Sequence, residues 1–331
     1  KRLKLAFQIP RDEKPVVDYD TEIHGEHFKT SQPVCRVLVK TGEPEGHSLY
    51  RQLLEKEIVN LSVHVDVRGV RSLELESDLG VLNASKPFYP FGTQPVKRSN
   101  FYIGYPELFE KNWNSLDVKI DWKNTPDSFV DLYSEYKNPV VDSNSHFKAK
   151  IEIQHKTTWE PATYFDEEKN KVALTEHVLF SSEGEGFVSQ FKIENSNYER
   201  DKNGPVRMSL SQSFYHEQFP RIYAYAIASG GTNPIIPNEP YTPVIETISL
   251  NYKASASVNL KVSEKDYTRN EIMLFHEHPF GQVEEHPFLK NQLSFLDEDE
   301  KKAFLLPDYC NGGELYIGLD NAEPTQTVSL L

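Results

Sequence analysis

The sequence predicts a mainly β protein made of two sandwich-like domains with a few short helices. The clearest evidence is alternation over residues 116–122, where Leu116, Val118, Ile120 and Trp122 share one face and charged residues share the other. This period of two is typical of a strand with one buried face. Aromatic residues make up 12% of the 331 residues, which is ample material for two cores of ordinary size.

Residues 1–84 are predicted to form a small β-rich domain. Alternating runs that predict its strands lie at residues 3–7, 37–39, 61–67 and 70–75. Ser48 is a candidate cap for a short helix that carries Leu49 and Leu53. Gly69 can supply the turn between the last two strands.

Residues 85–331 are predicted to form a larger sandwich-like region, introduced by a connector rich in proline and aromatic residues. The connector comprises residues 85–95, SKPFYPFGTQP. Its composition favours an extended backbone whose aromatic rings pack against the protein. Further alternating runs at residues 148–155, 187–193 and 245–252 predict strands, and in the last one residues 248, 250 and 252 form the apolar side.

Two helices and two loops are also expected in this region. The first helix is predicted to begin at Thr125 and to place the stripe of Phe129, Leu132, Tyr133 and Tyr136 in the core. The second carries apolar residues at 222, 223, 226 and 227 and ends at Gly230 and Gly231. Polar composition predicts a hairpin loop at residues 160–170 and a hairpin turn at residues 181–186.

The charge balance limits the classes of partner. The formal net charge is −14, which argues against nucleic acid or an anionic membrane surface as the main partner. The sequence contains no run of about eighteen apolar residues, so it predicts no membrane-spanning segment. Cys35 and Cys310 are the only cysteines, and such a distant pair favours two free thiols in a reducing cytoplasm.

Both ends suggest an internal fragment of a longer polypeptide. The chain begins with Lys1 rather than Met, and its last residues, TVSLL, lie within a predicted strand. A C-terminus truncated inside a sheet is therefore expected.

His276, His278 and His286 form the best candidate metal site. On a strand, residues 276 and 278 point the same way and could share a zinc ion, with Glu277, Glu284 or Glu285 as an oxygen ligand. The competing interpretation, which we favour, is that the segment FHEHPFG packs and forms hydrogen bonds as a structural turn. His24 and His27 are a weaker pair because no third ligand lies nearby. We therefore expect no metal and no cofactor.

The sequence contains no motif typical of an enzyme. It lacks Gly-x-Ser-x-Gly, a Walker phosphate loop and Gly-x-Gly-x-x-Gly, so we expect no catalytic residues. Two alternatives stay open. A carbohydrate-binding or adhesive sandwich could use Trp113 or Trp159 as a sugar platform, whereas Trp122 lies on the apolar face of its strand. A glycoside hydrolase fragment would need two carboxylates at a fixed separation in a cleft.

Four segments resemble the baseplate J-like wedge proteins of contractile injection systems, the phage-tail-like particles related to antifeeding prophages. The segments are KPFYPFG with FYIG and the strand ending in Trp122 (residues 86–122), PNEPYTP with the strand after it (237–252), FHEHPFG (275–281), and GELYIGL with the final VSLL (313–331). The likeness before residue 86 is general.

The resemblance implies a structural wedge subunit and no enzymatic activity. Its expected partners are a second wedge protein, the hub, the sheath, the tail-fibre proteins and copies of itself around a ring. It also implies assembly in the bacterial cytoplasm, followed by incorporation into an injection particle. We further expect residues 86–92 and 237–243 to pack between domains or to contact other subunits, because exposed aromatic residues in proline-rich loops are effective anchors.

Overall fold

The computed structural model describes most of the chain between residues 17 and 307. The described residues are 17, 19–24, 28, 34–39, 44–109, 113–136, 140–166, 170–183, 186–194, 203–229, 236–259, 273–278 and 281–307. The predicted strand at residues 3–7, His27, Cys310 and the segments at 313–319 and 328–331 lie outside them.

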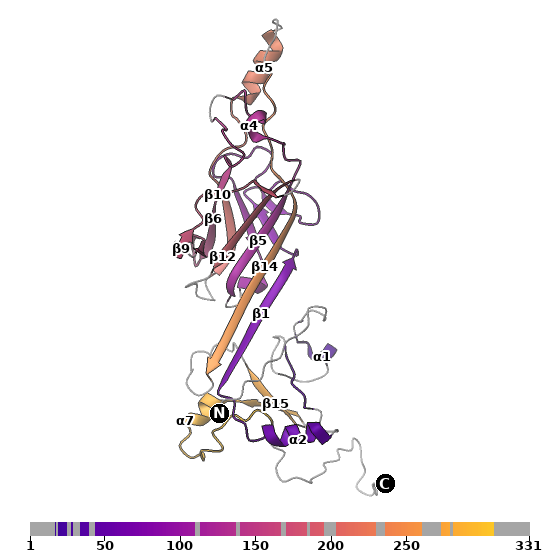
Figure 1. Ribbon diagram of the computed structural model, residues 1–331, viewed down its shortest axis with the longest axis vertical. Helices are drawn as coiled ribbons and strands as arrows, with labels where there is room; N and C mark the ends of the chain where they lie inside the picture. The colour runs from indigo at the N-terminus through magenta and orange to yellow at the C-terminus, as the bar shows by residue number, and fades with distance from the viewer. Residues whose placement is uncertain are drawn as a thin grey trace. The chain divides into compact units, whose positions relative to one another are not determined.

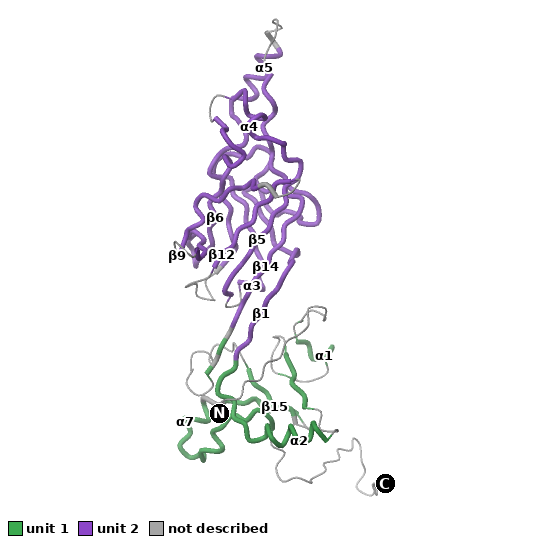
Figure 2. The backbone as a smooth tube through the Cα atoms, viewed as in Figure 1, with its two compact units in different colours: residues 1–61, 257–331 green, residues 62–256 purple. Residues whose placement is uncertain are grey.

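Contacts between Cα atoms divide the chain into two compact units (Figure 2). Unit 1 combines residues 1–61 with 257–331, and unit 2 comprises residues 62–256. This division differs from the expected domains 1–84 and 85–331. Residues 62–84 belong to unit 2 because they supply strands to both of its sheets.

Unit 2 contains a five-stranded and a seven-stranded sheet (Figure 1). The first has the order β1-β14-β5-β12-β11, with bounds Asn60–Val70, Val244–Asn259, Trp113–Lys123, Gly186–Glu194 and Ser181–Glu183. The second has the order β10-β6-β13-β4-β2-β3, and β7 also pairs with β6. Its bounds, in that order and ending with β7, are His177–Val178, Lys148–His155, Asn203–Leu210, Asn100–Gly104, Glu74–Ser77, Gly80–Leu82 and Thr158–Pro161.

The two sheets share one hydrophobic core, as in a sandwich. Leu116, Val118 and Ile120 of β5 belong to the same buried cluster as Ile151 of β6 and Met208 of β13. Aromatic rings from loops and short helices close one end of the core, with Phe129, Phe147, Phe180, Phe214 and Tyr241 in mutual contact. The mainly β class predicted from the sequence is confirmed.

Strand β5 confirms the alternation seen in the sequence. Leu116, Val118, Ile120 and Trp122 are buried, and the strand pairs antiparallel with both β12 and β14. The indole Nε1–H of Trp122 donates to the carbonyl oxygen of Leu179 at 2.9 Å, so the buried ring leaves no polar atom unpaired. The predicted strands at residues 148–155 and 187–193 correspond to β6 and β12.

Strand β14 departs from regular alternation at one position. The predicted apolar residues 248, 250 and 252 are buried, but Ile245 is buried as well. Ile245 pairs with Trp122 and Thr247 with Asp121, so Glu246 is an additional residue in a bulge. The bulge brings Ile245 onto the same face as Ile248.

The connector and the loop at residues 237–243 both pack against the sandwich. Phe88 and Phe91 are buried and contact Phe101. The hydroxyl of Tyr241 donates to the carbonyl oxygen of Lys123 at 3.0 Å. These contacts all lie within unit 2, so both segments support the sandwich itself. Their contact with other subunits stays a prediction.

Short helices accompany unit 2 outside its sheets. They are α3 (Pro106–Phe109), α4 (Phe129–Leu132) and α5 (Phe219–Ser229). The predicted start at Thr125 is wrong: Ser128 is the cap, because its hydroxyl accepts from the Asp131 N–H. The aromatic stripe is confirmed as core, since Phe129, Tyr133 and Tyr136 are buried. In α5, Ala226 is buried, whereas Tyr223 and Ile227 are exposed.

The polar segments of unit 2 form hairpins. The predicted loop at residues 160–170 instead contains β8 (Thr163–Asp166), which pairs with β9 (Asn170–Ala173). The predicted turn at residues 181–186 is confirmed in its described part, because Glu183 pairs with Gly186 across β11 and β12.

The described part of unit 1 includes a two-stranded sheet and short helices. They are β15 (Leu274–His278), β16 (Gly281–Glu285), α1 (Thr21–His24), α2 (Pro44–Leu53) and α7 (Pro287–Gln292). Ser48 is not a cap, because α2 begins at Pro44 and Ser48 lies inside it. Residues distant in sequence meet in this unit: the Ile58 N–H donates to Ala303 O at 2.7 Å, and the Leu305 N–H to Lys56 O at 2.8 Å.

Candidate functional site

The outer face of the seven-stranded sheet brings polar and aromatic side chains into one row. Arg207 of β13 lies between Glu152 of β6 and Tyr102 of β4, and Tyr102 in turn pairs with Glu76 of β2. On this face the side chains point away from the core, since their neighbours Leu75, Ile103, Val206 and Ile153 point into it. The row is therefore a surface built by strand register.

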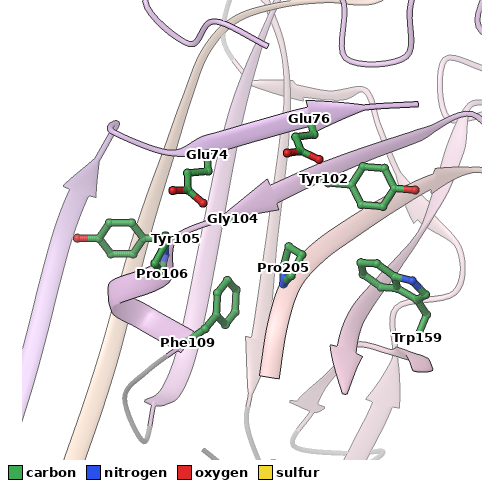
Figure 3. A pocket seen from close by; sticks show the side chains of 9 residues that line it. All are labelled: Glu74, Glu76, Tyr102, Gly104, Tyr105, Pro106, Phe109, Trp159 and Pro205. Carbon is green, nitrogen blue, oxygen red and sulfur yellow. The ribbon is translucent and has the colours of Figure 1, made fainter. Parts of the chain in front are cut away.

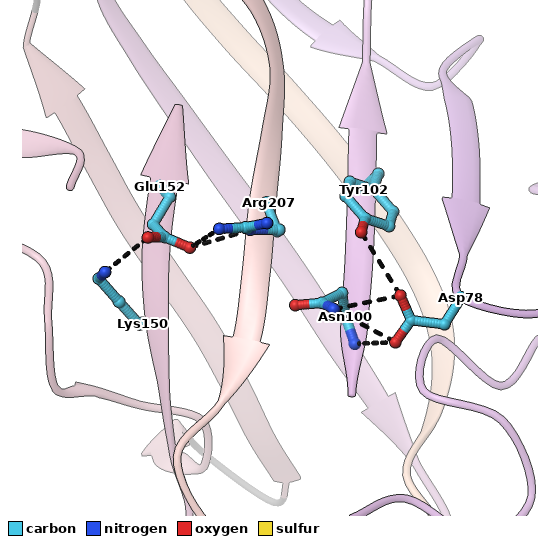
Figure 4. A network of polar contacts seen from close by, with 6 residues as sticks. All are labelled: Asp78, Asn100, Tyr102, Lys150, Glu152 and Arg207. Atoms are coloured by element: carbon cyan, nitrogen blue, oxygen red, sulfur yellow. Dashed lines mark hydrogen bonds and ion pairs between the residues drawn. The ribbon is translucent and has the colours of Figure 1, made fainter. Parts of the chain in front are cut away.

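A carboxylate with two cationic partners lies at one end of the row (Figure 4). Glu152 accepts from Arg207 Nη2 at 2.6 Å and Nε at 2.9 Å, and its other oxygen lies 2.5 Å from Lys150 Nζ. Burial disfavours the charged form, but the hydrogen bonds from Lys150 and Arg207 outweigh it and hold the pKa of Glu152 below its usual value. The Arg207 guanidinium also lies 4.2 Å from the centroid of the Trp159 ring.

Asp78 accepts hydrogen bonds at the other end of this network of polar contacts (Figure 4). Its carboxylate accepts from the backbone N–H of Asn100 at 2.7 Å and from the Asn100 side chain at 3.1 Å. The Tyr102 hydroxyl lies 3.4 Å from the same carboxylate. Burial, and then the charge of Asp78, raise the pKa of Tyr102.

A pocket of about 430 Å³ lies on this same face, beside the network (Figure 3). Glu74 and Glu76 of β2 line it together with four aromatic side chains and three small or cyclic residues: Tyr102, Tyr105, Phe109, Trp159, Gly104, Pro106 and Pro205. Gly104 lies close to β2, because a Cβ added there would lie 3.2 Å from the carbonyl oxygen of Glu74. The Tyr105 hydroxyl donates to Glu107 at 2.5 Å, and burial raises the pKa of Tyr105, so the phenol stays neutral.

His276, the first of the candidate metal ligands predicted from the sequence, contacts other residues of unit 1. His276 Nε2 lies 3.0 Å from the carbonyl oxygen of Phe304, and its Nδ1 lies 3.3 Å from Glu285. Both ring nitrogens therefore face oxygen atoms of the chain, which occupy the directions in which the ring would bind a metal. The hydrogen bond from His276, and then the contact with Lys290 at 2.7 Å, outweigh burial and lower the pKa of Glu285 to about 2.

The other candidate ligands are not gathered around one point. His286 lies 3.7 Å from Glu284, Glu277 lies 3.4 Å from Arg36, and the side chain of His278 is outside the described part. The His24 ring stacks on Tyr19. Within the described ranges, no group of three or more His, Cys, Asp or Glu side chains could hold a metal ion. Cys35 is an exposed free thiol.

The tryptophans bear on the carbohydrate-binding alternative. Trp113 is only 1% exposed and Trp122 only 7%, so neither offers an open platform for a sugar. Trp159 does line the pocket, but Arg207 lies over its ring. The structure therefore removes Trp113 from that alternative.

Sequence reasoning missed Glu74, Glu76, Tyr102 and Arg207 as a set. Each lies at a polar position of an alternating run, which is the only signal that the sequence carries. Their proximity depends on which strands are neighbours and in which register.

No helix among the described residues is long and apolar enough to cross a membrane.

The family of the chain is identified by comparison with known proteins. A search of curated proteins found no match. The family model described as "Baseplate protein PVC11-like" matches residues 49–331, well over half of the chain. This agrees with the baseplate resemblance carried by the four segments at residues 86–331. The chain thus belongs to the PVC11-like family of baseplate proteins, and its role is that of a structural component of a baseplate.

Proposed function

We propose that this chain is a wedge subunit in the baseplate of a phage-tail-like contractile injection particle. In this role it joins hub, sheath and tail-fibre proteins, a second wedge protein and further copies of itself in a ring. The observation that carries the proposal is the family match over residues 49–331. The subunit acts through protein contacts and not through a catalytic step.

The architecture of unit 2 supports a role as a scaffold. Its two sheets share one core, and the proline-rich connector is fastened to β14 through Phe88 and Ile245. Such a unit transmits contact forces with little internal deformation, because protein interiors are packed as densely as organic crystals. The net charge of −14 favours basic surfaces on the partners.

The proposed path is assembly in the bacterial cytoplasm followed by incorporation into a particle. Tyr89 is a candidate contact with a neighbouring subunit. It belongs to the connector, yet the residue is 47% exposed while its neighbours Phe88 and Phe91 are buried.

Electron microscopy of a deletion strain tests the proposal. The gene for the full polypeptide is deleted in a strain that makes the particles, and a plasmid copy serves as the control. We expect tube and sheath proteins to be made without assembled, sheathed particles, and the plasmid copy to restore them. Particles of normal shape and number in the deletion strain would show that the wedge assignment is wrong.

A further inference from the structure

The pocket on the outer face of the seven-stranded sheet contains two carboxylates that no cation neutralises within the described part of the chain. Glu74 and Glu76 are two residues apart on β2, so both side chains project from the same face (Figure 3). Neither makes a hydrogen bond or ion pair with the residues that the structure describes. Glu152, on the same face, differs because Lys150 and Arg207 neutralise it.

Four of the other seven residues that line the pocket are aromatic. Tyr102 and Trp159 lie with their ring centroids 5.7 Å apart, and Phe109 and Tyr105 line the pocket as well. A volume of about 430 Å³ falls within the range of pockets that hold small molecules. Carboxylates beside aromatic faces attract a cation both by charge and through the ring quadrupole.

The chain itself shows how a guanidinium binds on this surface. Arg207 lies over the Trp159 ring while it donates twice to Glu152. The pocket beside it offers the same two kinds of group, a carboxylate and an aromatic face, and none of the described residues that line it is a cation.

We propose that this pocket receives an arginine or lysine side chain from a neighbouring baseplate subunit. The inference rests on the proposed function for the identity of the partner, and on the pocket alone for the chemistry. A neutral sugar would leave the charges of Glu74 and Glu76 uncompensated, whereas a cationic side chain neutralises them and contacts the rings.

Fluorine NMR of the chain labelled with 5-fluorotryptophan tests the chemistry. The three tryptophans give three signals, and Trp159→Phe identifies the Trp159 signal by its loss. The signals of the buried Trp113 and Trp122 serve as internal references. The probe is the peptide acetyl-Gly-Arg-Gly-amide, and its citrulline analogue is the uncharged control. We expect only the Trp159 signal to shift in a saturable manner, and only with the arginine peptide.

Paired variants link the binding to the carboxylates. The double variant of Glu74→Gln and Glu76→Gln is expected to weaken binding at least tenfold. The matched double variant of Glu135→Gln and Glu217→Gln removes two exposed charges elsewhere in unit 2 and is expected to leave binding unchanged. Equal shifts with the citrulline peptide, or a Trp159 signal that responds to maltotriose and not to the arginine peptide, would overturn the proposal.

Particle assembly separates this inference from the proposed function. Strains that carry the Glu74 and Glu76 double variant are expected to yield fewer particles than strains with the matched control. Normal yields of particles that contain the variant chain would overturn the docking role while the wedge role stands. Particles that form in the absence of the chain would overturn the wedge role, and the partner assignment with it.

Discussion

Phe88 and Ile245 are joined by two backbone hydrogen bonds. The Phe88 N–H donates to Ile245 O at 3.2 Å, and the Ile245 N–H donates to Phe88 O at 2.9 Å. The connector is thereby aligned with β14 although the two segments are distant in sequence. The Phe88 ring is buried next to Phe101, so backbone and side chain fix the same point.

Replacement of Phe88 by alanine is expected to destabilise unit 2 by about 3–5 kcal/mol, because it leaves a cavity in the core. The control is Tyr89→Ala in the same segment, whose exposed ring is worth about 0.5 kcal/mol or less. Urea unfolding followed by the fluorescence of the buried tryptophans measures both. Similar midpoints for the two variants would contradict the packing role of the connector.

Deletion of Glu246 is expected to be tolerated, with a cost of about 1 kcal/mol or less. The residue is the additional one in the bulge, so its loss leaves Ile245 and Ile248 on the buried face of a regular strand. Deletion of Ser249 is the matched control and is expected to unfold unit 2, because it moves one part of the strand to the opposite face. Circular dichroism on heating distinguishes the two. A folded Ser249 deletion or an unfolded Glu246 deletion would show that the bulge does not set the register.

Glu152→Gln is expected to cost about 2 kcal/mol, since it leaves Lys150 and Arg207 without a counter-charge on a largely covered part of the sheet. This cost is lower than for a fully buried pair because Lys150 is 40% exposed. The control is Glu176→Gln, which breaks the exposed pair with Lys148 and is expected to cost about 0.5 kcal/mol or less. Chemical unfolding measures both, and equal costs would contradict the ranking.

His177 is expected to make unit 2 less stable as the pH falls from about 6.5 to about 4. Burial lowers the pKa of this histidine to about 4, so over that interval the unfolded chain takes up a proton that the folded chain does not. The loss reaches about 2 kcal/mol at pH 5. His177→Phe, which keeps a ring against Phe191, is expected to remove this contribution. The measurement is the difference in unfolding free energy between the two proteins at pH 7 and pH 5, and a difference independent of pH would refute the assignment.

The sequence allowed prediction of elements whose alternation is local. Strand β5 and the core position of Phe129 followed from residue spacing alone, because each depends on one face of one element. The bulge at Glu246 could not be predicted in this way, since a single additional residue is defined by the partner strand. The start of α4 was misplaced because Thr125 and Ser128 are both chemically suitable caps, and only backbone geometry distinguishes them.

The candidate site was harder to predict than the fold. Glu76, Tyr102 and Arg207 are ordinary polar positions of three separate strands, and the register between those strands makes them neighbours. The histidine segment showed the opposite problem. His276 and His278 are conspicuous in the sequence, yet His276 is engaged by Phe304, which lies 28 residues further along the chain.

The insertion of unit 2 within unit 1 imposes an order of events during synthesis. Ile58 and Leu61 leave the ribosome early, whereas Leu274 and Ala303, which pack with them, follow only after roughly 200 further residues. At about 5–20 residues per second, this delay is roughly ten to forty seconds. Unit 2 is synthesised within that interval, and its sequence is complete before Leu274 and Ala303 follow. The sandwich therefore has the opportunity to form first, while the early half of unit 1 must stay unaggregated until its other half has been translated.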